Sequence, residues 1–156
     1  MNRKAWADIM RIKFFEGEDG FMDEDAVKPG VYIVKLAKKS SKIEPINLYI
    51  GESYSMAQRC GRHLYETLVK NPKYFGLTPE MQKTKDLVLM FKVLKSFDKE
   101  LIKAENRDDI LKTAEKEYIR EIKPITQYET CDRVLPEEKR MKAVEEKVED
   151  LLGTGK

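Results

Sequence analysis

Two short apolar runs, joined by a polar connection, constrain the fold of this chain more than any other feature. The runs are VYIVKL (31–36) and INLYIG (46–51), and the connection between them ends in a proline. β-Branched and aromatic residues dominate both runs, which is typical of strands. The segment therefore predicts a β-hairpin, with Tyr32 near the start of its first strand and Tyr49 near the end of its second.

The residues after Gly51 have helical spacing and carry the only histidine of the chain. Apolar residues recur at every fourth position and predict the buried face of this helix, namely Met56, Cys60, Leu64 and Leu68. Arg59, Arg62 and His63 fall on a neighbouring stripe, because residues three and four apart share one side of a helix. The hairpin and the helix thus bring the polar ends of several side chains together, and this indicates a functional site.

The following segments complete an α+β pattern. LVLMFKVLK (87–95) predicts a third strand, and a helix is expected from Asn106, as its cap, to about Ile122. Pro124 ends this helix, because proline cannot continue the helical hydrogen bonds. Glu115 lies in the middle of its apolar face, and a carboxylate at such a position is a local anomaly.

The two ends of the chain add one segment each. Residues 2–15 are expected to pack on the core as a short helix or strand. Residues 136–156 predict an amphipathic helix that follows a single domain over residues 1–135. Its narrow apolar stripe consists of Met141, Val144, Val148 and Leu151. This stripe either docks on the core or pairs with a second copy of the chain to form a homodimer.

Composition restricts the class of protein. The net charge is only +2, so an anion-binding site must come from a local cluster of basic residues. Two cysteines without a CxxC pair, together with a single histidine, argue against a structural zinc site, although Cys60 and Cys131 leave one disulfide open. No apolar run is long enough to span a bilayer, and we expect a soluble cytoplasmic protein without a membrane partner.

The hairpin motifs, taken in order, resemble the GIY-YIG nuclease domain. Residues 30–32 read GVY, residues 48–51 read LYIG, and Arg59 follows the glycine by eight residues. His63, four residues after that arginine, is similar to a histidine found in several members of the family.

A downstream stretch, AEKEYIREIKPITQ (114–127), resembles the closing motif of the same family. Glu115 occupies the position of its helical glutamate, and Gln127 stands where the family usually has asparagine. The resemblance covers about residues 29–127. It implies an α+β fold with a small three-stranded antiparallel sheet, flanked by helices.

The resemblance also implies metal-dependent hydrolysis of a nucleic-acid phosphodiester, with double-stranded DNA favoured as the partner. Glu115 would hold one Mg²⁺ or Mn²⁺, since Mg²⁺ commonly takes one or two protein carboxylates. Arg59 would face the phosphate, where a guanidinium makes paired hydrogen bonds. Gln127 would complete the catalytic set. The general base remains open among Tyr32, Tyr49 and His63.

Further contacts with nucleic acid are expected from basic side chains near this helix, namely Arg62, Lys70 and Lys73. Target specificity would come from the loops at 37–45 and 72–85, or from the tail helix. Two alternatives stay open beside the endonuclease. One is a catalytically weak or inactive nucleic-acid-binding module of the same fold, and the other is a dimeric interaction protein.

Overall fold

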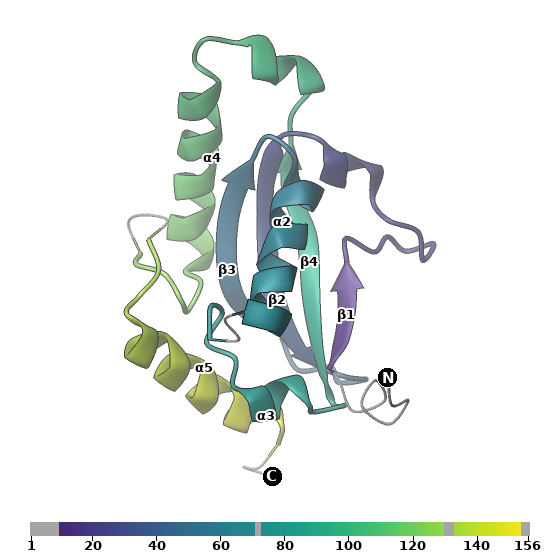
Figure 1. Cartoon of the computed structure of the whole chain (residues 1–156), viewed down its shortest axis with the longest axis vertical. Helices are drawn as coiled ribbons and strands as arrows, with labels where there is room; N and C mark the ends of the chain where they lie inside the picture. The colour runs from purple at the N-terminus through teal and green to yellow at the C-terminus, as the bar shows by residue number, and fades with distance from the viewer. Residues whose placement is uncertain (1–9, 71–72, 130–132, 154–156) are drawn as a thin grey trace.

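A computed structural model describes residues 10–70, 73–129 and 133–153 of the chain (Figure 1). This part is an α+β fold in which helices flank a four-stranded mixed sheet. None of its helices is long and apolar enough to cross a membrane. Residues 2–9 of the predicted N-terminal segment lie outside the described residues, as does Cys131, on which the open disulfide depends.

The sheet has the strand order β1-β4-β2-β3. Its strands are β1 (Arg11–Phe14), β2 (Gly30–Lys38), β3 (Ile46–Ser53) and β4 (Leu87–Ser96). β2 pairs antiparallel with both β3 and β4, which confirms the predicted hairpin and third strand. The prediction of a three-stranded antiparallel sheet was wrong, because β1 adds a parallel strand beside β4. The exposed edge of β4 accepts this short strand, and pairing across the chain decides its conformation.

The helices lie on both faces of the sheet. They are α2 (Met56–Tyr65), α3 (Pro79–Gln82), α4 (Arg107–Ile122) and α5 (Glu137–Leu151), with the short turns η1 (Glu24–Val27), η2 (Glu66–Lys70) and η3 (Lys99–Lys103). In Figure 1, α2 crosses one face of the sheet, whereas α4 runs along β3. The bounds of α4 confirm the helix predicted before Pro124.

The buried face of α2 differs from the predicted one. Met56 and Cys60 are buried as expected, and Leu64 is half-buried against the core. His63 of α2 and Thr67 of η2 are buried as well, whereas Leu68 of η2 is 39% exposed. A four-residue period drifts around a helix by about 40° per step, since each residue turns the chain by about 100°. The buried residues therefore recur at intervals of three or four residues. The interval of three after Cys60 places His63 on the buried side of the helix.

Alternation along β2 divides the interior into two clusters. Tyr32, Val34 and Leu36 belong to the larger cluster, which α2 covers, whereas Val31 and Ile33 pack with α4 on the opposite face. Successive side chains of a strand point to opposite faces, so both layers of helices pack on the same strand.

The tail helix α5 docks on the larger cluster of its own chain. Val144, Val148 and Leu151 are buried there, and Met141 is half-buried. The apolar stripe on which the predicted homodimer depends is therefore already covered within the chain.

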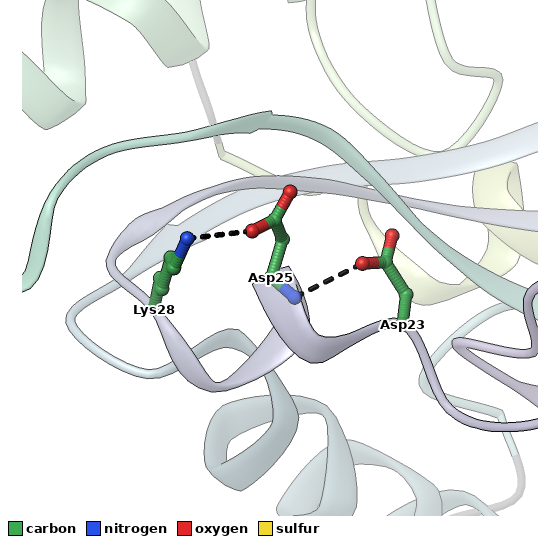
Figure 2. Close-up of polar contacts among 3 residues, drawn as sticks. All are labelled: Asp23, Asp25 and Lys28. Carbon is green, nitrogen blue, oxygen red and sulfur yellow. Dashed lines mark hydrogen bonds and ion pairs between the residues drawn. The ribbon is translucent and has the colours of Figure 1, made fainter.

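A short acidic segment leads the chain into β2. Figure 2 shows the Asp23 carboxylate accepting a hydrogen bond from the backbone N–H of Asp25 at 2.9 Å, and Lys28 Nζ donating to the Asp25 carboxylate at 2.8 Å. The backbone carbonyl of Lys28 accepts from the N–H of Met56, the first residue of α2. Because the Lys28–Asp25 pair is solvent-exposed, we ascribe to it a role in orienting η1 rather than a large stabilisation.

Gly76 provides a test of how tightly α5 docks. Its φ is +75°, and an added Cβ would lie 2.6 Å from Val144 Cγ2 and 2.9 Å from the carbonyl oxygen of Arg140. Gly76→Ala should lower the free energy of unfolding by about 1–3 kcal/mol, through strain and overpacking. The control is Gly61→Ala in α2, where an added Cβ meets nothing within 4 Å, and it should raise stability by about 0.5–1 kcal/mol. Chemical denaturation measures both, and equal stability of wild type and Gly76→Ala would contradict tight docking.

Candidate active site

A buried hydrogen bond joins the sheet to α2. The hydroxyl of Tyr32 lies 3.0 Å from Nε2 of His63, and both side chains are almost fully buried. Gly51 stands opposite Tyr32 in the neighbouring strand, and a Cβ at Gly51 would collide with the Tyr32 hydroxyl. The glycine of the LYIG run therefore leaves the room that this phenol occupies.

Two further tyrosines enclose the imidazole of His63. Tyr49 of β3 approaches it edge-on with ring centroids 5.6 Å apart, and Tyr74 stacks on it at 5.0 Å with an interplanar angle of 27°. The phenol groups of Tyr49 and Tyr74 also interact with each other. The tyrosine–histidine cluster thus comprises Tyr32, Tyr49, His63 and Tyr74.

Sequence reasoning missed Tyr74. It lies between α2 and α3, in the loop 72–85, for which only a role in target specificity was expected. Nothing in the spacing of this loop places Tyr74 near His63. The available signal is the Tyr74-Phe75-Gly76 run, since consecutive aromatic residues before a glycine are unusual in a solvated loop.

Burial keeps the cluster uncharged. It raises the pKa values of Tyr32 and Tyr49 well above the usual value for a phenol. Burial, followed by the positive charges of Arg59 and Arg62, lowers the pKa of His63 to about 4. Removing a group from water disfavours its charged form, so all three side chains are neutral near pH 7.

A cationic pocket adjoins the cluster. Ser53, Gln58, Arg59 and Arg62 line a depression of about 260 Å³ at the N-terminal half of α2. Both arginines are exposed, and the charge of Arg59 acts on the phenols of Tyr32 and Tyr49 by opposing the rise of their pKa values. The arrangement places an exposed guanidinium, which also hydrogen-bonds to Tyr32, at the solvent side of buried hydroxyl groups, and this suits an anionic ligand.

Glu115 approaches the cluster from the other side of β3. It is 3% exposed and is the one buried acidic side chain among the residues that the structure describes. Its charge is one of the causes that raise the pKa of Tyr49, although burial is the larger cause. α4 positions it, because Ala114 and Ile119 of the same helix pack against the sheet.

The donor chemistry at Glu115 fits a hard divalent cation only in part. A carboxylate oxygen is the ligand type that Mg²⁺ prefers, and one or two protein carboxylates with water and phosphate oxygens complete its shell. Within residues 10–70, 73–129 and 133–153, no group of three or more His, Cys, Asp or Glu side chains forms a ready-made metal site. A cation at Glu115 would therefore depend on the substrate for ligands.

Gln127 is engaged with the backbone of β3. Its Oε1 accepts from the N–H of Ile50 at 2.9 Å, and its Nε2 donates to the carbonyl of Ile50 at 2.8 Å. Thr126 Oγ1 donates to the carbonyl of Leu48 at 2.6 Å in the same stretch. The segment after α4 thus covers the edge of β3 beside Tyr49, and the Gln127 amide positions this strand rather than facing the cluster.

The predicted nucleic-acid contacts are dispersed. Arg62 lines the cationic pocket beside Arg59, as expected from their shared stripe. Lys70 is exposed at the end of η2, more than two helical turns beyond Arg62. Nζ of Lys73 lies 3.6 Å from Oε1 of Glu137 in α5. The structure therefore groups Arg62 with the site, whereas Lys73 connects its loop to the tail helix.

Comparisons with known protein families, with curated proteins and with solved structures gave no match to this chain.

The role of Gln127 can be tested by shortening it. Gln127→Asn keeps the amide but removes one methylene, so the side chain cannot reach both backbone groups of Ile50. We expect the free energy of unfolding to fall by about 1–3 kcal/mol, the cost of leaving buried polar groups unpaired. Gln58→Asn on the exposed side of α2 is the matched control and should change stability by only a few tenths of a kcal/mol. Unchanged stability of Gln127→Asn in chemical denaturation would refute the structural role.

The single histidine allows its pKa to be measured by NMR without assigning other residues. We expect the imidazole to titrate near pH 4 in wild type. Tyr74→Ala should move this pKa upward toward about 6.5, because the imidazole gains water, whereas Tyr74→Phe keeps the ring and a low pKa. Since the unfolded chain binds this proton first, the free energy of unfolding should fall as pH drops from about 6.5 toward 4. A wild-type titration near 6.5 would show that the cluster is open to solvent.

Proposed function

We propose that this chain is a metal-dependent endonuclease that hydrolyses phosphodiester bonds in double-stranded DNA, of the GIY-YIG type that its motifs resemble. The observation that carries the proposal is the buried hydrogen bond between Tyr32 and His63, with Arg59 at its solvent side. Titratable groups with perturbed pKa values beside a pocket are candidates for function.

Arg59 would bind the scissile phosphate. A guanidinium makes two parallel hydrogen bonds to phosphate oxygens and keeps its charge at every physiological pH. Arg62 lines the same pocket and would contact a neighbouring phosphate. The two arginines would thereby neutralise the charge on the nonbridging oxygens beside the buried hydroxyl groups.

Tyr32 would act as the general base in its phenolate form: it would first release its own proton to solvent and then take a proton from the attacking water, with His63 holding the ring in place. The positive charge of Arg59 favours the phenolate, because it lowers the pKa of Tyr32 against the effect of burial. Nδ1 of His63 is buried without a hydrogen-bond partner in the described residues. A buried N–H without an acceptor is rarer than an unpaired acceptor, so we assign the proton to Nε2, which then donates to the Tyr32 oxygen. A donor on the phenol oxygen stabilises its anionic form and offsets part of the effect of burial.

Tyr49 and Tyr74 would position this pair. Burial raises the pKa of Tyr49 well above its usual value, so its hydroxyl stays protonated and serves as a hydrogen-bond donor. The stacked ring of Tyr74 keeps water from the imidazole of His63. Exclusion of water strengthens each electrostatic contact within the cluster.

A divalent cation held by Glu115 would supply charge neutralisation for the phosphate and for the leaving oxygen, and would lower the pKa of nearby hydroxyl groups. Glu115 is a buried carboxylate whose charge acts on the phenol of Tyr49, and this position beside the cluster supports the choice of this residue as the protein ligand.

The proposal is tested by nicking of supercoiled plasmid in Mg²⁺ or Mn²⁺. Glu115→Gln should abolish the reaction, and Tyr32→Phe should slow it by a factor of roughly 10²–10⁴, the usual contribution of a positioned proton acceptor. Glu117→Gln on the exposed side of α4 and Tyr65→Phe on the exposed side of α2 are the matched controls and should keep wild-type rates.

Wild-type turnover by Glu115→Gln would remove the metal site, and wild-type turnover by Tyr32→Phe would place the base elsewhere. A wild-type chain that binds duplex DNA but cuts no plasmid in either metal would favour the alternative of a binding module. The circular dichroism of each variant must match that of wild type for these comparisons to hold.

A further inference from the structure

Among the helices that the structure describes, α4 covers only one half of its sheet face. α4 packs on β2 and β3, through residues that include Ala114 and Ile119, and Figure 1 shows it running along β3, away from β1. Arg11 and Lys13 of β1 are in register with Val88 and Met90 of β4. Side chains at paired positions point to the same face, so the basic residues of β1 lie on the open half of this face.

A groove of about 530 Å³ occupies this open half. Its floor is apolar and includes Ala37, Val88 and Met90. Its basic side chains come from β1 on one side and from the hairpin connection on the other, namely Arg11, Lys13, Lys39 and Lys42. Glu44 is the one acidic residue that lines it. A second hollow of about 330 Å³ continues it, because both are lined by Lys13 and Met90.

Arg11, Lys39 and Lys42 of the groove are exposed to solvent. The ion pairs of Lys28, Lys73 and Lys103 lie elsewhere in the chain. The whole chain carries a net charge of only +2, so four basic side chains against one acidic side chain in a single groove depart from the average composition. Like charges repel at such density, and a polyanion would relieve this repulsion.

We propose that this groove binds the phosphate backbone of a DNA segment other than the one at the tyrosine–histidine cluster. The choice of DNA as the polyanion rests on the proposed function, whereas the groove itself rests on the positions of its basic residues. Lysine and arginine on two opposing sides match a charged strand that runs between them, and the apolar floor suits deoxyribose rings.

A lipid surface fits the groove less well. Peripheral membrane binding needs apolar side chains that enter the acyl layer, in addition to basic residues. Val88 is 5% exposed and Met90 is 9% exposed, so the floor offers little apolar surface for insertion, and the half-exposed Ile43 adds a single apolar side chain at the rim. The basic residues are also arranged around a hollow rather than on a protruding face.

The position of the groove determines what its loss should do. Tyr32 points into the cluster that α2 covers, whereas the groove opens on the opposite face of the same sheet. A straight duplex lies along one face of a small domain, so the groove would hold a bent or second segment. Removing its charge should therefore weaken DNA binding without changing the cleavage rate at saturating DNA.

The test reverses two charges in the hairpin connection of the full chain, Lys39→Glu with Lys42→Glu. The matched control is Lys112→Glu with Lys116→Glu on the exposed side of α4, which changes the net charge equally.

Fluorescence anisotropy with a labelled 30-base-pair duplex in EDTA, over a series of salt concentrations, measures Kd. We expect the groove variant to weaken Kd by at least about tenfold and to reduce the salt slope by about 2, or about 0.9 for each lost phosphate contact. The control should stay within about twofold of wild type.

Each result separates the groove from the proposed cleavage. Equal Kd values for wild type and the groove variant would refute DNA binding in the groove. An equal loss of affinity in the groove variant and the control variant would refute it as well. In both cases, plasmid nicking would still support the nuclease. Loss confined to the groove variant supports the groove even when wild type cuts no plasmid. Tighter binding of wild type to phosphatidylserine vesicles than to the duplex would overturn the choice of DNA. Absence of binding by wild type overturns the groove outright.

Discussion

β2 is buried on both faces, and its register determines where the functional side chains of the hairpin point. Tyr32 faces α2 because Val31 and Ile33, its neighbours in the strand, pack beneath α4. A slip of one residue would exchange the two faces and place the phenol against α4. The hydrogen bond to His63, the room left by Gly51 and the approach of Tyr49 all depend on this register.

The two edges of the β4–β2–β3 unit are closed in different ways. β1 pairs with β4 and brings Arg11 and Lys13 to the open sheet face. On the other side, Gln127 uses a side-chain amide in place of a strand to pair with Ile50. The first device creates a basic groove, and the second fixes the strand that carries Tyr49. The contacts that close the two edges of the sheet thus also determine where these polar and charged groups lie.

The proposed site combines a neutral interior with a charged rim. Burial leaves the phenols and the imidazole uncharged, whereas Arg59 and Arg62 remain in solvent at the pocket beside them. The docked helix α5 packs against the loop that carries Tyr74, because Gly76, two residues after Tyr74, lies beside Val144 of α5. The tail helix is therefore part of the cluster's support.

Sequence by itself determined the hairpin, the third strand, α4 and the inward position of Glu115, because strong apolar periodicity and Pro124 leave little choice there. It also indicated Tyr32, Tyr49, Arg59 and His63 as one site. Only the tertiary structure decided that β1 joins the sheet, that Tyr74 covers His63, and that Gln127 pairs with Ile50. These contacts join residues far apart in the chain, and local spacing carries no information about which distant partner a short strand, a loop or an amide will meet.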